Sequence, residues 1–182
     1  MIFALDVCYR GGEAFSAAVG FSSFEARSPR IEYTDRSDIA CNYIPGEFYR
    51  RELPAVVHLI ERYRLEPELL IVDGYVTLDE NGRAGFGYAL YEYFEQRVPV
   101  IGVAKSRFGK ISSLHELYRG GSRRPLYITA AGIEIEEAKE AIGKMHGPYR
   151  IPDILRYVDR LSRYECGEGK SLPPEKGGNQ VT

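Results

Sequence analysis

The segment Leu69–Val76, LLIVDGYV, constrains the fold of this chain more than any other feature. It is a nearly continuous apolar run that ends at Asp73-Gly74. Successive residues of a strand point to opposite faces of a sheet, so a strand that is apolar throughout has both faces covered. Pro99–Lys105, PVIGVAK, has the same character. These two runs predict a central sheet with helices on both sides, and therefore an α/β protein.

The segments around these two strands predict a mixed sheet. Ile2–Tyr9 is a dense apolar strand, and Ala14–Phe24 follows as its hairpin partner across a turn that contains Gly11-Gly12. A third strand is expected around Ile31–Tyr33, with Arg36–Asn42 as a weaker candidate. The other expected elements are a strand at Arg124–Ala131 and helices at Glu52–Leu65, Gly85–Arg97, Ile133–Met145 and Pro152–Tyr164. This order indicates an antiparallel meander followed by alternating helices and strands.

The length of the chain fits one domain with a substantial core. It has 182 residues, of which 44% are hydrophobic and 27% charged, as in an ordinary globular protein. We expect a single domain over residues 1–165 and a disordered tail over 166–182, which is rich in Gly, Pro and charge. No run is long and apolar enough for a membrane span. We expect a monomer.

The cysteines and the N-terminus favour a cytoplasmic protein. Asp6 comes too early for the apolar region of a signal peptide. Cys8, Cys41 and Cys166 have unrelated spacings, which form neither a disulfide framework nor a zinc pattern. The net charge of −2 neither indicates nor excludes nucleic-acid binding, because an acidic active site can mask a local basic patch. The clusters of Arg and Lys, such as Arg119–Arg124, also fit solvated loops.

Three acidic residues stand where catalytic carboxylates are often found. Asp6 interrupts an apolar strand, Asp73 ends another, and Glu52 opens the helix between them. Ligands of α/β sheets gather at the carboxyl ends of parallel strands. Converging carboxylates there suit Mg²⁺, which prefers oxygen ligands, and a pair of metal ions would suit phosphodiester hydrolysis. Each acid taken alone also fits a helix cap or a turn.

Two other catalytic readings are weaker. Gly82–Gly87 imitates a glycine-rich phosphate loop, but it follows a polar loop rather than a strand, which disfavours a dinucleotide site. The histidines, His58, His115 and His146, have no Cys or Ser at a useful local spacing. We therefore expect structural or surface roles for them.

These segments together resemble the endonuclease V family. The resemblance rests on ALDVCY with Asp6, YIPGEFYRRELP with Tyr43 and Glu52, LLIVDGY with Asp73, VPVIGVAKSRF with Lys105, and GPYRIPDILRYVD near the end. The blocks occur in the family's order and spacing over most of positions 2–160. The resemblance implies a ribonuclease H-like fold and Mg²⁺-dependent hydrolysis of a phosphodiester near a deaminated base, usually hypoxanthine, in DNA or RNA; Mn²⁺ is a possible substitute for Mg²⁺.

The resemblance also implies roles for particular residues. Asp6, Glu52 and Asp73 would bind the metal, and Lys105 would face the phosphate or the attacking water. Tyr43-Ile44-Pro45-Gly46 would be a wedge that keeps the strands apart while the base is flipped into a pocket. Gly74 and Tyr75 would lie beside that pocket and contact the nucleic acid.

The chain departs from the family pattern at two places. The resemblance implies a Gly-His pair before the late helix, whose histidine completes the acidic site, but Ala130-Ala131 stands there. Nearby acids could supply an acidic ligand or could form an exposed helix face with Lys139: Glu134, Glu136 and Glu137. The loop after Asp73, GYVTLDENGRAG, lacks the family's His-Pro and adds the bulk of Tyr75. The alternative function is thus a catalytically weak or inactive relative that binds nucleic acid or a partner.

Overall fold

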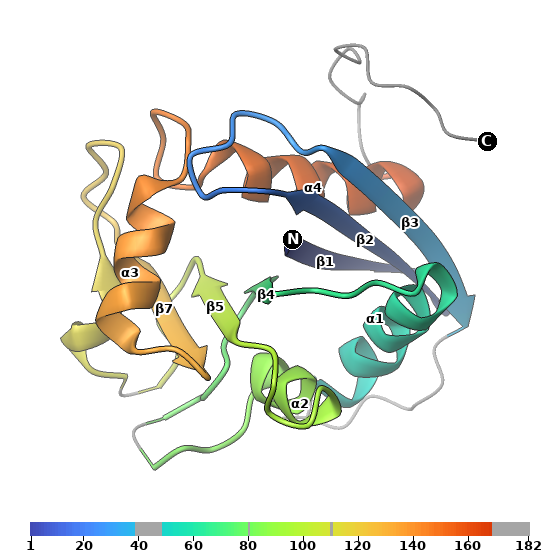
Figure 1. The fold of residues 1–182 in the computed structure, drawn as a ribbon, viewed down its shortest axis with the longest axis horizontal. Coiled ribbons are helices and arrows are strands. Elements are labelled where there is room, and N and C mark those ends of the chain that lie inside the picture. The colour runs from blue at the N-terminus through green and yellow to red at the C-terminus, as the bar shows by residue number, and fades with distance from the viewer. Residues whose placement is uncertain (39–48, 80, 110, 169–182) are drawn as a thin grey trace.

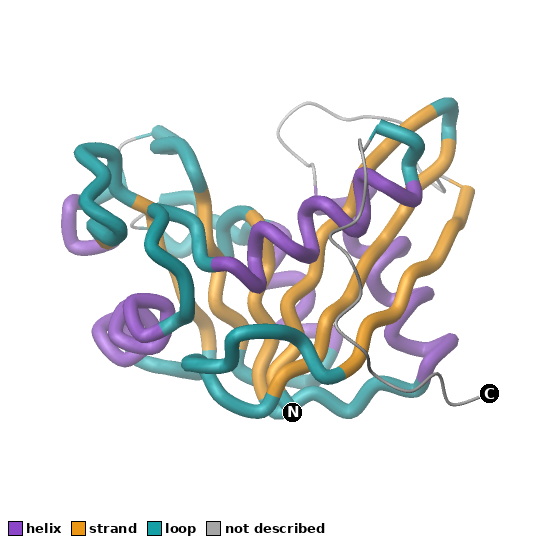
Figure 2. Tube along the Cα trace, turned by 90° about the horizontal axis from the view of Figure 1, so that it is seen from above, coloured by secondary structure: helices purple, strands orange, loops and turns teal. Residues whose placement is uncertain are grey.

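A seven-stranded sheet forms the centre of the molecule (Figure 1). The structure is a computed structural model, and it describes residues 1–38, 49–79, 81–109 and 111–168. The strands lie in the order β3-β2-β1-β4-β5-β7-β6. Their bounds are β1 Ile2–Arg10, β2 Glu13–Phe21, β3 Ile31–Asp38, β4 Leu69–Asp73, β5 Val100–Ala104, β6 Glu116–Leu117 and β7 Leu126–Ala131. Seen from above in Figure 2, the strands lie side by side as one layer.

Helices cover both faces of this sheet. α1 (Tyr49–Tyr63) and α2 (Phe86–Tyr93) pack on one face, while α3 (Ile135–Lys144) and α4 (Asp153–Glu165) pack on the other. α4 lies along β1 and β2, and α3 lies beside β7 (Figure 1). The expected mixed sheet with an antiparallel meander and flanking helices is confirmed.

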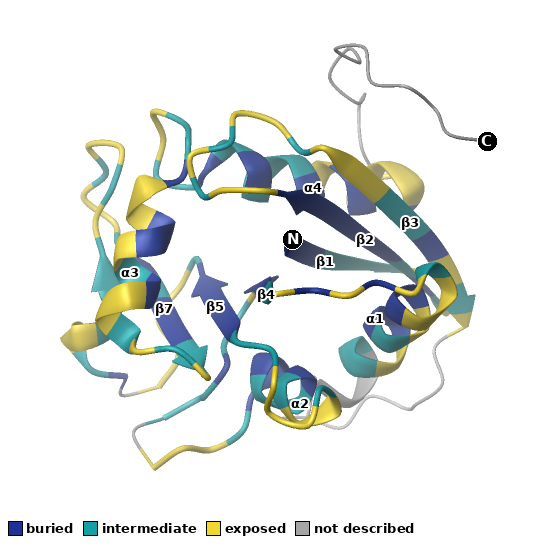
Figure 3. Cartoon of the chain, viewed as in Figure 1, coloured by how far each residue is buried: buried dark blue, intermediate teal, exposed yellow. Residues whose placement is uncertain are grey.

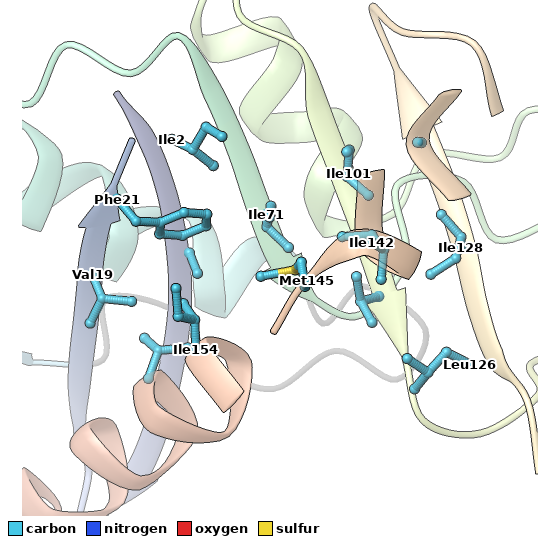
Figure 4. Close-up of a cluster of buried hydrophobic side chains, with 14 of the residues drawn as sticks. Ile2, Val19, Phe21, Ile71, Ile101, Leu126, Ile128, Ile142, Met145 and Ile154 are labelled. Carbon is cyan, nitrogen blue, oxygen red and sulfur yellow. The ribbon is translucent and has the colours of Figure 1, made fainter. Parts of the chain in front are cut away.

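Alternation along the strands divides the core into two layers. Ile71 of β4 packs with Ile101 and Ile128 of the neighbouring strands, under Ile142 of α3 and Ile154 of α4 (Figure 4). The intervening residues of the same strands point the other way, and Leu70, Val72 and Val100 pack against α1 and α2. The central strands are therefore buried on both faces, as their apolar runs require (Figure 3).

Most of the expected elements lie within a few residues of their predicted bounds. The hairpin partner of β1 ends at Phe21 rather than Phe24, and α3 begins at Ile135 rather than Ile133. The sequence reading missed β6 and a short 3₁₀ helix, Ser113–His115, because segments this short carry no measurable periodicity. No helix among the described residues is long and apolar enough to cross a membrane.

The described part of the chain ends at Glu168. Residues 169–182, which make up most of the predicted tail, lie outside the described residues. Cys166, where the tail was expected to begin, is buried. The guanidinium of Arg10 donates hydrogen bonds to the carbonyls of Cys166 and Gly167, at 3.0 and 2.9 Å. The segment directly after α4 is therefore part of the packed structure.

The register of the parallel strands aligns their carboxyl ends. Leu5 of β1 lies opposite Val72 of β4, and Asp73 lies opposite Val103 of β5. Asp6 and Asp73, the next residues along β1 and β4, therefore lie side by side on neighbouring strands. Lys105 comes directly after β5 at the same edge. This edge is where ligands of α/β folds are expected.

Candidate active site

Three carboxylates meet at the carboxyl edge of the parallel strands. They belong to Asp6 of β1, Asp73 of β4 and Asp159 of α4, and one oxygen of each lies within 4.8 Å of the others. Asp6 and Asp73 were predicted to converge, and the strand register brings them together. We call these three residues the carboxylate cluster.

The face of β1 that α4 covers determines where Asp6 points. Ile2 and Ala4 pack into the core layer beneath α3 and α4, so Asp6, two residues further along, faces the same side. The hydroxyl of the buried Ser162, on α4, donates a hydrogen bond to Asp6 Oδ2. Asp159 precedes Ser162 by nearly one helical turn, so both side chains reach the same strand end.

Lys105 is the cation of the carboxylate cluster. Its Nζ lies 2.5 Å from Asp73 Oδ2 and 3.2 Å from Asp159 Oδ1, and both contacts are hydrogen-bonded ion pairs. Burial by itself would lower the pKa of Lys105, but the hydrogen bonds and attraction of Asp73 and Asp159 raise it above its ordinary value. The ammonium group is therefore held charged between two carboxylates.

Burial makes the ionised form of Asp6 unfavourable. Burial raises its pKa to about 6; the hydrogen bond from Ser162 opposes this shift, while the negative charges of Asp73 and Asp159 add to it. Lys105 offsets only part of this repulsion. Three neighbouring carboxylates that pair only with Lys105 and Arg163 form a site that a further cation would stabilise.

A cavity of about 380 Å³ opens over these side chains. Its walls are formed by Leu5, Asp6, Val7, Cys8, Tyr9, Glu52, Asp73, Phe86, Asp159, Arg163 and Glu168. Glu52 therefore lines the same cavity as Asp6 and Asp73, although it stands on α1, across the sheet from α4. Arg163 adds a second cation to the wall, with its Nε 3.3 Å from Asp159 Oδ2.

The donor set fits a hard divalent ion. All the ligands that the carboxylate cluster offers are carboxylate oxygens, which Mg²⁺ and Mn²⁺ prefer over nitrogen or sulfur. The cavity leaves room for water and for a substrate oxygen beside the carboxylates. Asp6, Asp73 and Asp159 are thus able to hold such an ion, and Glu52 faces the same space.

Asp159 is the site residue that the sequence reading missed. In PDILRYVDRLSRY it reads only as one polar position of an amphipathic helix. A signal was present, since Asp159 and Arg163 are one turn apart, but such pairs are common on exposed helix faces. Only the packing of α4 on β1 shows that this face meets the end of the sheet.

The expectation drawn from Ala131 needs correction. Ala131 pairs with Val100, the first residue of β5, whereas Asp73 pairs with Val103 near its other end. Ala131 therefore lies away from the carboxylate cluster, and the position beside Asp6 is held by Asp159. The alternative acids on α3 do not replace it: Glu136 forms an ion pair with Lys139 at 3.1 Å, and that face lines a separate surface depression.

Tyr75 is tied to the loop that follows Lys105. Its hydroxyl donates to the carbonyl of Ser106 at 2.7 Å and accepts from the backbone N–H of Phe108 at 3.1 Å. The ring centroids of Tyr75 and Phe108 lie 6.1 Å apart. Gly74 precedes it with a φ of 137°, a conformation that side chains disfavour, and its N–H donates to Val103 at 3.2 Å. Gly74 therefore ties the loop after β4 to β5, and Tyr75 ties it to the loop that follows β5.

The predicted wedge lies outside the described residues. Tyr43, Ile44, Pro45 and Gly46 fall within residues 39–48, so their role remains a prediction. The histidines, among the described residues, contact other groups: His58 with Asp35, His115 with the Ile128 carbonyl and His146 with Asp153. None of them is among the residues that line the cavity.

Cys8 also lines the cavity, but as a neutral thiol. Burial, a hydrogen bond with Cys166 and the nearby Glu168 raise the pKa of Cys8 to about 12. A thiol with this pKa is a poor nucleophile at neutral pH. We therefore assign it no role in covalent catalysis.

The family model and the curated relatives identify one family. The family model described as Endonuclease V matches residues 1–132 of this chain. An endonuclease V of Alkalilimnicola ehrlichii is 29% identical over 174 residues, which cover 84% of this chain and 74% of the relative. One from Desulfurococcus amylolyticus is 26% identical, with 91% and 81% covered.

Solved structures show the same fold. The crystal structure of human ENDOV superimposes with a TM-score of 0.75 at 23% identity, covering 92% of this chain and 84% of the human one. Endonuclease V of Ciona intestinalis, in complex with a 24mer DNA containing an inosine followed by a ribo-adenosine, gives a TM-score of 0.76 at 20% identity. That match covers 92% of this chain and 86% of the other. The sheet and its flanking helices thus have the ribonuclease H-like arrangement of these proteins.

Proposed function

We propose that this chain, which belongs to the endonuclease V family, is a metal-dependent endonuclease that hydrolyses a phosphodiester near a deaminated base in nucleic acid. The observation that carries the proposal is the carboxylate cluster, Asp6, Asp73 and Asp159, beside Lys105 in an open cavity. Such a constellation suits phosphoryl chemistry better than acyl or redox chemistry, because it offers oxygen ligands and a fixed cation but no activated nucleophile.

The metal would be held by the carboxylate cluster, with Glu52 on the opposite wall of the cavity. Mg²⁺ is the proposed ion and Mn²⁺ its substitute, since both accept an all-oxygen donor set. When bound, such an ion supplies charge stabilisation at the phosphate and lowers the pKa of a coordinated water.

The side chains of this chain position the reacting groups. Lys105 is anchored by Asp73 and Asp159, so its ammonium is held beside the carboxylates that would bind the metal. A charged ammonium fixed in advance stabilises negative charge that develops in the transition state without reorganising. The hydroxyl of Ser162 donates to one oxygen of Asp6 and so orients this carboxylate, which lines the cavity.

A deaminated base is the proposed recognition element. The Ciona relative is bound to DNA that contains an inosine, and this chain shares its fold over most of its length. Tyr43-Ile44-Pro45-Gly46 are proposed as the wedge and Gly74 and Tyr75 as contacts to the nucleic acid. Tyr75 presents an aromatic ring beside Phe108, which is 43% exposed, and aromatic faces of this kind accept stacked bases.

The experiment that tests the proposal is a cleavage assay on the full chain. End-labelled single- and double-stranded DNA and RNA, each with one inosine, are incubated with Mg²⁺ or with Mn²⁺. We expect a single product near the inosine, lost on addition of a chelator and in Asp73→Asn. Asp38→Asn, at the exposed far edge of the sheet, is the matched control and should cleave normally.

The alternative function becomes an outcome of the same assay. An inactive relative that binds nucleic acid or a partner was suggested by Ala131, whose position lies away from the carboxylate cluster. Binding of the inosine substrates without any product, with either metal and all four substrates, would overturn the proposed hydrolysis and favour that alternative.

A further inference from the structure

A second cluster of metal-ligating side chains lies beside the first but has different chemistry. Sγ of Cys8, Sγ of Cys166 and a carboxylate oxygen of Glu168 all lie within 4.8 Å of one another. Cys8 is on β1, two residues beyond Asp6, whereas Cys166 and Glu168 come directly after α4. We call these three residues the thiol cluster.

We propose that the thiol cluster is a site for a soft divalent metal ion of the Zn²⁺ class. On a tetrahedral ion with Zn–S bonds of about 2.3 Å, two sulfur ligands lie about 3.8 Å apart. The three donor atoms lie within 4.8 Å of one another, which is close to this spacing. Thiolate ligands select soft or borderline ions, which separates this site from the all-oxygen carboxylate cluster.

The end of α4 is built so that it presents two of these ligands. Gly167 has a φ of 74°, and its N–H donates to the carbonyl of Tyr164 at 2.9 Å. The N–H of Glu168 donates to the carbonyl of Arg163, also at 2.9 Å. These two bonds form a Schellman motif with glycine in the left-handed position, which reverses the chain after Cys166. The reversal brings Glu168 back toward Cys8.

Arg10 holds this turn against β1. Its guanidinium donates to the carbonyls of Cys166 and Gly167, and a Cβ at position 167 would lie only 2.5 Å from Arg10 Nη1. Cys8 and Arg10 stand two residues apart on β1, on the same face. β1 thus supplies one ligand of the thiol cluster, Cys8, and through Arg10 holds the turn that carries the other two.

Arg163 lies near Glu168 and the thiol cluster is open to solvent on the Glu168 side. Glu168 Oε2 lies 3.8 Å from Cys8 Sγ and 3.8 Å from Arg163 Nη1. The Glu168 side chain is 46% exposed, so an ion can enter from solvent. Three protein donors leave one position of a tetrahedral ion for water. A bound ion would join β1 to the end of α4, the same two elements that supply Asp6 and Asp159.

The test is cobalt titration of the full chain. The protein is kept reduced with a phosphine under nitrogen, and excess Mg²⁺ is present to occupy the carboxylate cluster. Co²⁺ bound by thiolate produces a near-ultraviolet charge-transfer band that carboxylate-bound Co²⁺ does not. We expect this band to saturate at one equivalent and to disappear when Zn²⁺ is added.

Variants assign the band to particular residues. Cys8→Ser and Cys166→Ser should each abolish it, whereas Cys41→Ser, which removes the remaining cysteine of the chain, should leave it unchanged. Glu168→Gln alters an exposed side chain and should preserve the fold while weakening Co²⁺ binding by about tenfold or more. Circular dichroism of each variant establishes that it is folded.

Several results would overturn the proposal. These are the absence of a thiolate band in the wild type, a band that persists in Cys8→Ser, and unchanged affinity in Glu168→Gln. A Cys8–Cys166 disulfide in protein prepared without reductant, together with no cobalt band after reduction, would identify a redox pair instead of a metal site.

Discussion

The carboxylate cluster and the thiol cluster use the same two elements in different ways. Both join β1 to α4 or its end, because Asp6 and Cys8 are two residues apart and so lie on the same face of β1, the face that α4 covers. In the carboxylate cluster the ligands are held by strand register and by the body of the helix. In the thiol cluster two ligands are held by the turn that ends the helix.

The two clusters also differ in how they balance charge. Asp73 and Asp159 share the ammonium of Lys105, which remains in place as a permanent cation. In the thiol cluster the raised pKa of Cys8 keeps that thiol neutral, so a metal that binds it would displace its proton. Arg163 lies between the clusters, near Asp159 at 3.3 Å and Glu168 at 3.8 Å. Donor chemistry rather than position therefore separates the ions that each can hold.

The largest effect is expected from removing a charge at the strand edge. Asp6→Asn should lower the rate of inosine-directed cleavage by about 10²- to 10³-fold, the loss that follows removal of one electrostatic group from a catalytic site. The measurement is single-turnover cleavage with Mg²⁺. Cys8→Ser, two residues along the same strand, serves as the comparison and should retain most of the activity. Equal losses in both variants would mean that the two clusters do not act separately.

Asp159→Asn should have the next largest effect. We expect metal affinity to fall by about tenfold or more, with a matching loss of cleavage at limiting Mg²⁺. Glu136→Gln on α3 is the control, because that acid pairs with Lys139 away from the cavity. A loss in Glu136→Gln without one in Asp159→Asn would restore α3 as the source of the acidic ligand.

Lys105→Met tests whether the permanent cation matters for stability as well as catalysis. Without the ammonium, Asp73, Asp159 and Asp6 repel one another, so we expect a lower melting temperature in chelator. Mg²⁺ should recover most of this loss, because it binds the folded state. Calorimetry with and without Mg²⁺ provides the measurement. A melting temperature that Mg²⁺ does not raise in this variant would place the metal elsewhere.

Ser162→Ala should have a moderate effect on activity. It removes the hydroxyl that orients Asp6, and loss of such an outer contact commonly costs about tenfold in metal affinity or rate. Isothermal titration of Mn²⁺, with cleavage rates measured at saturating metal, separates affinity from rate. Ser162→Cys, which keeps the volume but donates weakly, should fall between alanine and the wild type.

Gly167→Ala should have the smallest effect, and it falls on the thiol cluster. A side chain in the left-handed conformation costs about 1–2 kcal/mol of folding free energy. Gly12→Ala is a matched control, since Gly12 also has a positive φ but no atom within 4 Å of its would-be Cβ. Urea unfolding should show a loss in both variants, the larger in Gly167→Ala because its Cβ meets Arg10, while only Gly167→Ala should weaken Co²⁺ binding. Equal Co²⁺ affinities in Gly167→Ala and Gly12→Ala would mean that the turn at Gly167 does not position the metal ligands.

The central strands and three of the acids followed from the sequence by itself. Apolar runs define β1 and β4, with Asp6 inside the first strand and Asp73 at the end of the second, because periodicity and burial are local properties of the chain. Glu52 was singled out as the acid that opens the helix between them, and the structure places it in the wall of the cavity. The family resemblance added Lys105, which the structure pairs with Asp73. The fold class was correct for the same local reasons.

The partners from the last helix were decided only by tertiary structure. Asp159 is one polar position among several on α4, and Cys8 and Cys166 are 158 residues apart with no recognisable spacing. Their meeting depends on the angle at which α4 packs across β1 and on the turn at Gly167, which summed long-range contacts determine. A sequence specifies which side chains can bind an ion, whereas packing decides which of them meet.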